Sequence, residues 1–185
     1  LWMVGDIRQA VLSTNARSAK NKKYAYAEAI NWFRSREKKG LLAIEESAVS
    51  WRCHPKIAAF SDTIFDPSWA FPSTVSKNDH TTGHDGVFLV RSEHVPAYVA
   101  QYGPQSLRHS VASAKNLALD FMNFKVSKGA TFPRVLIAPT STITNFVRGG
   151  VSMDAIAASS FYVAVTRAQQ SVAIVLDDPG MSRLP

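Results

Sequence analysis

The sequence predicts an α/β fold with a mainly parallel sheet. Short apolar segments alternate along the chain with segments of helical periodicity, and this alternation is typical of repeated strand–helix units. Most of the apolar segments are continuous, which indicates strands that are buried on both faces, as they are in a parallel sheet. The length of 185 residues is typical of one domain. We therefore expect a single sheet with helices covering both of its faces.

The opening segment, residues 1–4, is an apolar run that leads into a turn at Gly5 and Asp6. We interpret this run as the end of a buried strand. A buried strand needs neighbours for its backbone groups and for both of its faces. We therefore expect the chain to be the C-terminal part of a longer protein.

The rest of the first half contains two expected helices and one expected strand. Ala27, Ile30 and Phe33 recur at helical spacing, and Gly40 is a suitable stop signal. Pro55 favours the first turn of the second helix. The expected elements are a loop over 5–21, a helix over 24–39, a strand over 41–50, a helix over 55–65 and an irregular, turn-rich connection over 66–85.

The second half is more regular because its apolar segments are rich in β-branched residues. Gly103 and Pro104 break one helix, and a glycine-containing turn separates two of the strands. The expected strands are 86–91, 120–124, 135–138 and 171–176, and the expected helices are 95–102 and 154–169.

The composition favours a polyanionic partner. The formal net charge is +7, and a basic surplus of this kind is typical of proteins that bind nucleic acid, although it also serves solubility. The single cysteine, Cys53, excludes an intrachain disulfide and a cysteine-based zinc site. No segment has the length and apolarity of a membrane span. We expect a cytoplasmic protein with no membrane partner.

Two segments carry side chains that suit phosphate recognition near the start of the chain. Gln9 ends the turn segment that begins at Gly5 and offers both a donor and an acceptor. Arg52 lies between the expected strand and helix and offers a forked set of donors. Taken alone, the first segment is more typical of a plain turn and the second of a surface charge.

Two further segments lie in the second half. Lys125, Lys128 and Gly129 fall between two expected strands, where backbone N–H groups and lysines can approach phosphates. The spacing is not that of a G-x-x-x-x-G-K-[ST] phosphate loop. Arg167 follows a strongly apolar segment on the last expected helix, so we expect it at the edge of the core, where it needs an anionic partner or a route to solvent.

The order of these segments resembles a known family. Gly-Asp-x-x-Gln, then Trp-Arg, then Lys-Gly-x-x-Phe, then Tyr-Val-Ala-x-Thr-Arg-Ala is similar to motifs III, IV, V and VI of the UvrD/Rep-like superfamily 1 helicases, over residues 4–175. The resemblance implies a RecA-like (P-loop NTPase-type) three-layer α/β domain with a mainly parallel sheet. It divides the chain into 1–20, the end of a first RecA-like domain with motif III and a linker, and 21–185, the second RecA-like domain.

The resemblance also implies roles for individual residues. Gln9 matches the glutamine that senses the ATP γ-phosphate, and Arg52 and Arg167 match two arginines that reach this phosphate from the second domain. These three are therefore expected to be catalytic. ATP contacts are expected from the same three residues and from Gly129 and Thr131.

Nucleic-acid contacts follow from the same alignment of motifs. Lys128 matches the lysine of motif V, Lys125 falls where the family usually carries a DNA-contacting histidine, and Asn15 takes the place of the arginine of motif III. DNA binding is therefore expected at Lys125, Lys128 and Asn15. Leu12 replaces the usual aromatic residue of motif III, and base stacking there lacks a π face.

The implied activity is ATP-dependent DNA unwinding or translocation by the full-length protein, with ATP and Mg²⁺ as cofactors. The phosphate-binding loop and the Mg²⁺ ligands are expected upstream of Leu1, so this fragment alone should be inactive. Expected partners are single-stranded or partly duplex DNA and the first RecA-like domain of the same protein. Compact relatives occur in antiphage systems, where a nuclease subunit is a further candidate partner, and DNA repair is the other candidate pathway.

Two departures from the family leave a second function open. Thr131 replaces the usual glutamate that contacts the nucleotide ribose, and the altered motif III lacks its aromatic residue. The alternative is a catalytically inactive, helicase-derived subunit that binds nucleic acid or acts as a scaffold.

Other candidate sites are less convincing. His80, His84 and Asp85 lie in a polar loop without a nearby cysteine, and we expect no metal site there. Trp32, Trp51 and Trp69 are expected to pack in the core or at its edge.

Overall fold

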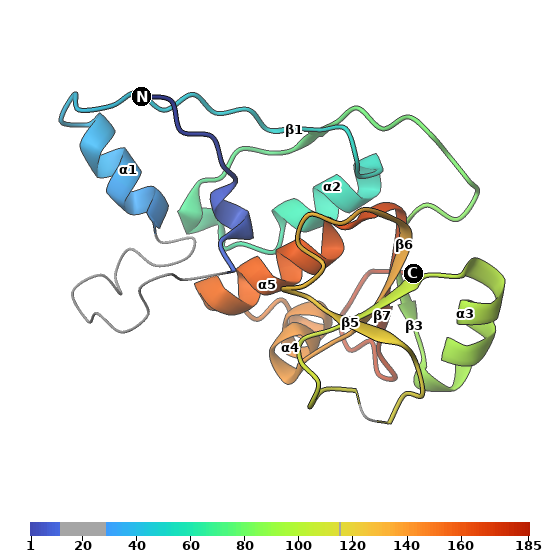
Figure 1. The fold of residues 1–185 in the computed structure, drawn as a ribbon. Coiled ribbons are helices and arrows are strands. Elements are labelled where there is room, and N and C mark those ends of the chain that lie inside the picture. Colours follow the sequence, from blue (N-terminus) through green and yellow to red (C-terminus); the bar gives the residue numbers. More distant parts are fainter. Residues whose placement is uncertain (12–28, 115) are drawn as a thin grey trace.

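The computed structural model describes residues 1–11, 29–114 and 116–185. Its centre is a five-stranded sheet in the order β3-β7-β6-β4-β5 (Figure 1). Every neighbouring pair of strands in this sheet is parallel. The strands are β3 (Gly86–Val90), β4 (Gln105–Arg108), β5 (Phe121–Asn123), β6 (Phe132–Ala138) and β7 (Ala168–Val175).

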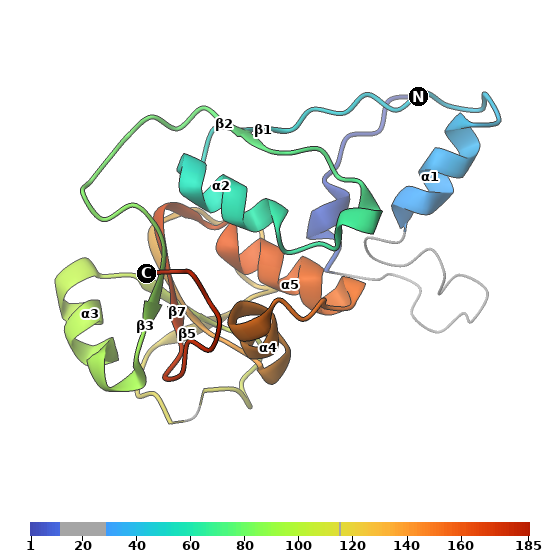
Figure 2. The same ribbon diagram turned by 180° about the vertical axis from the view of Figure 1, so that it is seen from behind.

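Helices cover both faces of the sheet, and a small second sheet lies at the other end of the molecule (Figure 2). The second sheet pairs two short parallel strands, β1 (Val49–Ser50) and β2 (Val75–Ser76). The helices are α1 (Ala29–Glu37), α2 (Pro55–Asp62), α3 (Val95–Tyr102), α4 (Ser141–Gly149) and α5 (Ala155–Val165), and the 3-10 turns are η1 (Ile7–Gln9), η4 (Pro67–Trp69) and η5 (Ser92–His94).

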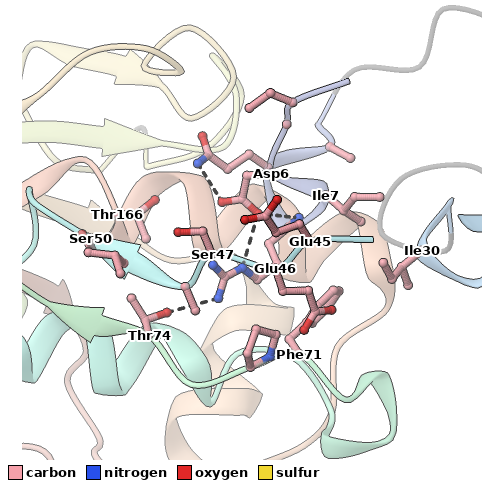
Figure 3. Close-up of a pocket in the computed structure, with 18 of the residues that line it drawn as sticks. Asp6, Ile7, Ile30, Glu45, Glu46, Ser47, Ser50, Phe71, Thr74 and Thr166 are labelled. Atoms are coloured by element: carbon pink, nitrogen blue, oxygen red, sulfur yellow. Dashed lines mark hydrogen bonds and ion pairs between the residues drawn. The ribbon is translucent and has the colours of Figure 1, made fainter. Parts of the chain in front are cut away.

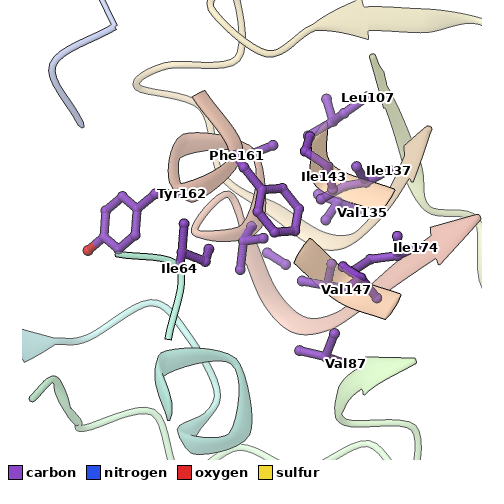
Figure 4. Close-up of a cluster of buried hydrophobic side chains, with 14 of the residues drawn as sticks. Ile64, Val87, Leu107, Val135, Ile137, Ile143, Val147, Phe161, Tyr162 and Ile174 are labelled. Carbon is purple, nitrogen blue, oxygen red and sulfur yellow. The ribbon is translucent and has the colours of Figure 1, made fainter. Parts of the chain in front are cut away.

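The core lies on both faces of the sheet because successive residues of a buried strand point in opposite directions. Val135 and Ile137 of β6 pack with Phe161 of α5 in the larger cluster (Figure 4). Leu136, between them, packs on the opposite face with Val95 and its neighbours on α3. The chain is therefore a three-layer α/β domain with a parallel sheet, as expected.

Helix α5 is the central helix of the larger layer. Its residues 158–165 are all buried, so it has no polar face of its own. Asp154 caps its first turn by accepting hydrogen bonds from the backbone N–H groups of Ile156 and Ala157 at 2.9 and 2.8 Å. Thr166 ends it, because its hydroxyl donates to the carbonyl of Tyr162 at 2.7 Å.

The expected strands and helices of the second half are confirmed, with small changes at their ends. The helix that the sequence predicts over 154–169 ends at Val165, and β7 already begins at Ala168. Arg167 therefore lies between α5 and β7 and not on the helix. It is wholly buried and not at the core edge, because several carbonyls around it accept its N–H groups.

Two expected strands in the first half are wrong. Residues 1–4 form no strand and are exposed to solvent. Of the strand expected over 41–50, only Val49 and Ser50 pair with a neighbour. Both segments are apolar enough to be strands, but neither has strands on both sides to satisfy its backbone groups in the part of the chain that the structure describes.

In the second half of the chain, one strand and one α-helix escaped the sequence prediction. Strand β4 is a polar segment, Gln-Ser-Leu-Arg, and is a strand because β5 and β6 pair with it on both sides. Helix α4 follows the N-cap Thr140 and ends at Gly150, whose φ of 68° is in the left-handed region. Both caps are visible in the sequence, but the β-branched residues between them favour a strand.

Candidate functional site

A cleft of about 1050 Å³ lies between η1, the segment 42–52 and the end of α5 (Figure 3). One part of its lining is polar and includes Asp6, Gln9, Arg52, Lys128 and Thr166. The other part is mostly apolar and includes Ile7, Ile30, Phe33, Ile44 and Phe71. The cleft therefore combines a cluster of hydrogen-bonding groups with an apolar wall, as ligand sites commonly do.

Arg167 lies behind the polar end of this cleft. The side chain is 1% exposed, and its Nε donates to the carbonyl of Val163 at 3.0 Å while Nη1 donates to that of Ala130 at 3.3 Å. These bonds hold the guanidinium in one orientation, with Nη2 directed at Gln9. Burial, and next to it the positive charge of Arg52, lower the pKa of the Arg167 guanidinium.

Gln9 meets Arg167 directly. Its Oε1 accepts from Nη2 of Arg167 at 3.2 Å, although the two residues are 158 positions apart in the sequence. Its Nε2 donates to Oδ2 of Asp6 at 2.9 Å. Asp6 also accepts from the backbone N–H of Arg8 at 3.0 Å and so caps η1, the turn that presents Gln9.

Arg52 comes from the connection between β1 and α2 and lies on the other side of Thr166. Its Nη1 donates to the carbonyl of Thr166 at 3.0 Å, which leaves part of the guanidinium facing the cleft. Arg52 and Arg167 thus approach the same short turn after α5. The structure therefore places Gln9, Arg52 and Arg167 around the same turn.

The turn between β5 and β6 contributes a lysine to the same place. Nζ of Lys128 donates to the backbone carbonyl of Gln9 at 3.0 Å and lines the cleft. Gly129 has a φ of 93°, a conformation that favours glycine. Thr131, just before β6, and Lys125, at the start of the turn, are both exposed and lie outside the cleft lining. The DNA-binding position predicted at Asn15 lies outside the described residues.

The sequence interpretation missed two aromatic residues of the site. Trp51 was expected to pack in or beside the core, but 77% of it is exposed and it lines the cleft beside Arg52, so that expectation is wrong. The sequence feature that could have identified Trp51 as a site residue is its position directly before Arg52. Tyr162 lines the cleft with its hydroxyl 3.5 Å from Asp6, and burial raises the pKa of this hydroxyl, which keeps it protonated.

Trp69 follows the expectation and packs at the core edge, stacked on Phe71 at 6.1 Å. His84, one of the three residues weighed as metal ligands, has its ring stacked on Phe88 and Tyr102 with centroids 4.1 and 3.9 Å away. Burial is the main reason that the pKa of this imidazole is lowered. Its environment is that of a packing residue.

Comparison with known proteins gives matches to solved structures only. No protein-family model matches the sequence, and no curated protein does. The fold is similar to that of the PRRSV helicase, with 18% identity and a TM-score of 0.45 over 75% of this chain and 24% of that chain. It is also similar to the C-terminal domain of a possible DNA helicase from Lactobacillus plantarum, with 13% identity and a TM-score of 0.43 over 72% of this chain and 91% of that domain. The chain thus spans about a quarter of the length of the PRRSV protein.

Within the described residues, the helices are all too short or too polar to span a bilayer.

Proposed function

We propose that this chain is the C-terminal part of an ATP-dependent DNA helicase or translocase, and that the polar end of the cleft binds the γ-phosphate of ATP. The observation that carries the proposal is the contact between Oε1 of Gln9 and Nη2 of Arg167 at 3.2 Å. The motif resemblance assigns both residues to the same phosphate, and the fold brings them into contact from opposite ends of the chain.

The chemistry of the site supports this assignment. Arg52, Arg167 and Lys128 direct positive charge at one end of the cleft. Phosphoryl transfer spreads negative charge over the terminal oxygens, and planar guanidinium groups stabilise that charge by forked hydrogen bonds. The oxygen of Gln9 accepts the same Arg167 N–H that a phosphate oxygen would accept. Gln9 is therefore well placed to respond when a phosphate arrives.

Trp51 is suited to contact the base of the bound nucleotide. Its ring is largely exposed in the cleft next to Arg52, and an exposed indole offers a π face on which a base can stack. Gly129 and Thr131 frame the backbone that holds Arg167, because the carbonyl between them, that of Ala130, accepts from its Nη1. In this proposal the groups that cradle the phosphates and hold Mg²⁺ come from the part of the protein upstream of Leu1.

DNA contacts are proposed at Lys125, Lys128 and Asn15. Lysines on an exposed turn hold phosphates without reading sequence, and the net charge of +7 favours such binding. Of the two described lysines, Lys128 is also tied to Gln9 through the carbonyl contact. A strand bound at this turn would therefore contact the same turn that orients the phosphate sensor.

A second candidate is a scaffold that binds nucleic acid without hydrolysing ATP. The observation that favours it is Thr131, which presents no carboxylate to a nucleotide ribose. The two functions differ in whether the full-length protein hydrolyses ATP.

The test is DNA-stimulated ATP hydrolysis by the full-length protein, compared with its Arg52→Ala and Arg167→Ala variants. We expect each substitution to lower kcat, with Arg167→Ala losing about 10³-fold or more, the range typical of an arginine finger. Arg52→Ala is the cleaner variant because, among the described residues, the Arg52 side chain makes a single hydrogen bond, to Thr166. Arg167→Ala also removes a donor from the carbonyls of Val163 and Ala130, so its thermal stability must be measured in parallel.

Arg91→Ala is the matched control, because Arg91 is an exposed arginine at the end of β3 and its partner Glu93 is equally exposed. Its activity should equal that of the wild type. A wild-type protein that binds DNA but hydrolyses no ATP would favour the scaffold. Unchanged kcat in a folded Arg52→Ala variant would remove Arg52 from the site.

A further inference from the structure

A chain of polar contacts runs from Gln9 to the far side of η1, where it reaches α2 and the segment before β2. Oδ2 of Asp6 holds the amide of Gln9, and Oδ1 of the same carboxylate accepts from Nε of Arg8 at 3.3 Å. Nη1 of Arg8 then donates to Oγ1 of Thr74 at 3.2 Å and lies 3.4 Å from Oδ1 of Asp62. Figure 3 labels Asp6 and Thr74, and its dashed lines mark interactions between the residues drawn there.

From this geometry we infer that Arg8 is a positioning residue that, anchored by Asp62 and Thr74, holds Asp6 and thereby fixes Gln9 against Arg167. The inference rests on the proposed function, since it assigns Arg8 to the same phosphate site. Nε and Nη1 of Arg8 are engaged by Asp6, Thr74 and Asp62. In this inference Arg8 therefore acts on the phosphate site through Asp6 and Gln9.

The anchor is rigid without Arg8. Both oxygens of the Asp62 carboxylate already accept hydrogen bonds from Thr74, at 2.6 Å from its backbone N–H and 2.7 Å from its hydroxyl. These two residues therefore keep their geometry whether or not Arg8 is present. Arg8 gains a fixed position from them, and the effect runs from the anchor toward Gln9.

The ion pair of Arg8 is partly shielded from water, which strengthens it. The side chains of Arg8 and Asp62 are only 13% and 20% exposed, and the guanidinium of Arg8 lies 4.8 Å above the centre of the Tyr162 ring. Ion pairs that are partly withdrawn from water interact more strongly than exposed ones, and a ring face adds a cation–π attraction.

The consequence for Gln9 is a defined orientation of its amide. A carboxylate can only accept hydrogen bonds and a guanidinium can only donate them. Asp6 therefore requires Nε2 of Gln9 on its side, and Arg167 requires Oε1 on the other. If the Arg8 side chain is removed, the Asp6 carboxylate loses its charged partner and keeps only the backbone N–H of residue 8 on that oxygen. The restraint that selects this orientation of the Gln9 amide is then weaker.

The test is a double-mutant cycle on the full-length protein, with kcat and KM for DNA-stimulated ATP hydrolysis measured for Arg8→Gln, Gln9→Ala and the double variant. We expect Arg8→Gln to lower kcat between about 10- and 100-fold, since misplacement of a catalytic group by about 1 Å has effects of this size, while KM for ATP stays within about twofold of the wild type. The double variant should be no slower than Gln9→Ala alone, because Arg8 acts through Gln9.

A purely structural role would give a different result, since the losses of the two single variants would then multiply. That outcome, or an unchanged kcat in Arg8→Gln, would overturn the inference while leaving the proposed function standing. An unchanged kcat in Gln9→Ala would overturn the inference and would also remove Gln9 from the proposed phosphate site. Absence of ATP hydrolysis in the wild type would instead refute the proposed function, and this positioning role with it. Arg91→Gln is the control for loss of an arginine charge.

A second variant tests the same positioning role in case Arg8→Gln does not fold. Asp62→Asn keeps the size of the anchoring side chain, but it removes the charge and replaces one acceptor oxygen by a donor. It should lower kcat by a smaller factor than Arg8→Gln, and the loss should again vanish in the Gln9→Ala background. Thermal unfolding of every variant separates loss of folded protein from loss of positioning. A loss that persists in the Gln9→Ala background would count against the inference.

Discussion

Arg167 is held by its own fold and is also the residue that we propose for the γ-phosphate. Three of its nitrogen atoms donate to acceptors in its own fold, and one of them also meets the oxygen of Gln9. A buried cation that is held by neutral acceptors retains most of its charge for an incoming anion. The sequence indicated that Arg167 needs an anionic partner or a route to solvent. Among the residues that the structure describes, its N–H groups are instead satisfied by neutral acceptors.

Cys53 gives a second prediction for a single residue, which concerns the reactivity of its thiol. Its Sγ is buried beside the carbonyl of Thr166 at 3.7 Å. Burial raises the pKa of this thiol, an effect larger than the opposing influence of Ser50 and the two arginines. Since the thiolate is the reactive form, we expect the native protein to react with an aromatic disulfide reagent at pH 8 at least about tenfold more slowly than the denatured protein, followed by absorbance.

The sign of the accompanying pH effect follows from the raised pKa. The folded state holds the thiol proton more tightly than the unfolded chain, so this contribution to stability is fully present below the unfolded pKa of about 8.5 and is lost as the pH rises above it. Cys53→Ala should remove this part of the alkaline loss in denaturant unfolding. Equal reaction rates for native and denatured protein would show that the thiol is not buried in solution.

At the scale of elements, strand content was easier to predict than helix ends. The strands β3, β6 and β7 are short apolar runs with many β-branched residues, and that local pattern suffices to predict them. The end of α5 was predicted four residues too late. The residues that begin β7, Ala168, Gln169 and Gln170, are good helix formers, so the local pattern does not mark the end of the helix.

The N-cap of α5 gives a prediction for an element. Asp154→Ala removes the acceptor of two backbone N–H groups, and loss of such a cap typically lowers the free energy of unfolding by about 1 kcal/mol. Urea unfolding of the variant should show a lower midpoint at an unchanged slope. Asp120→Ala, which changes an exposed carboxylate before β5, serves as the control. An effect of equal size in both variants would argue against a capping role.

For the whole molecule, the basic surplus predicts a salt-dependent affinity for nucleic acid. The affinity for single strands should fall linearly on a logarithmic scale as salt rises, with a slope of about −0.7 for each phosphate contacted. Lys125→Ala and Lys128→Ala in the full-length protein should each make this slope less steep by about that amount, measured by fluorescence anisotropy. Arg91→Ala should leave it unchanged. A slope that neither lysine substitution alters would place the DNA path elsewhere.

The layered α/β architecture could be predicted from the residues alone, because burial of a strand is a local property. The order of motifs, a linear property, nominated Gln9, Arg52 and Arg167 as candidate site residues but missed Trp51 and Tyr162. The contact of Gln9 with Arg167, the exposure of Trp51 and the anchoring of Arg8 by Asp62 could not be predicted from either property. Each depends on which distant segments the sheet and α5 bring side by side, and pairwise distances of this kind are set by packing of the whole domain. A run of apolar residues such as 1–4 or 41–48 likewise becomes a strand only where neighbouring strands accept its hydrogen bonds.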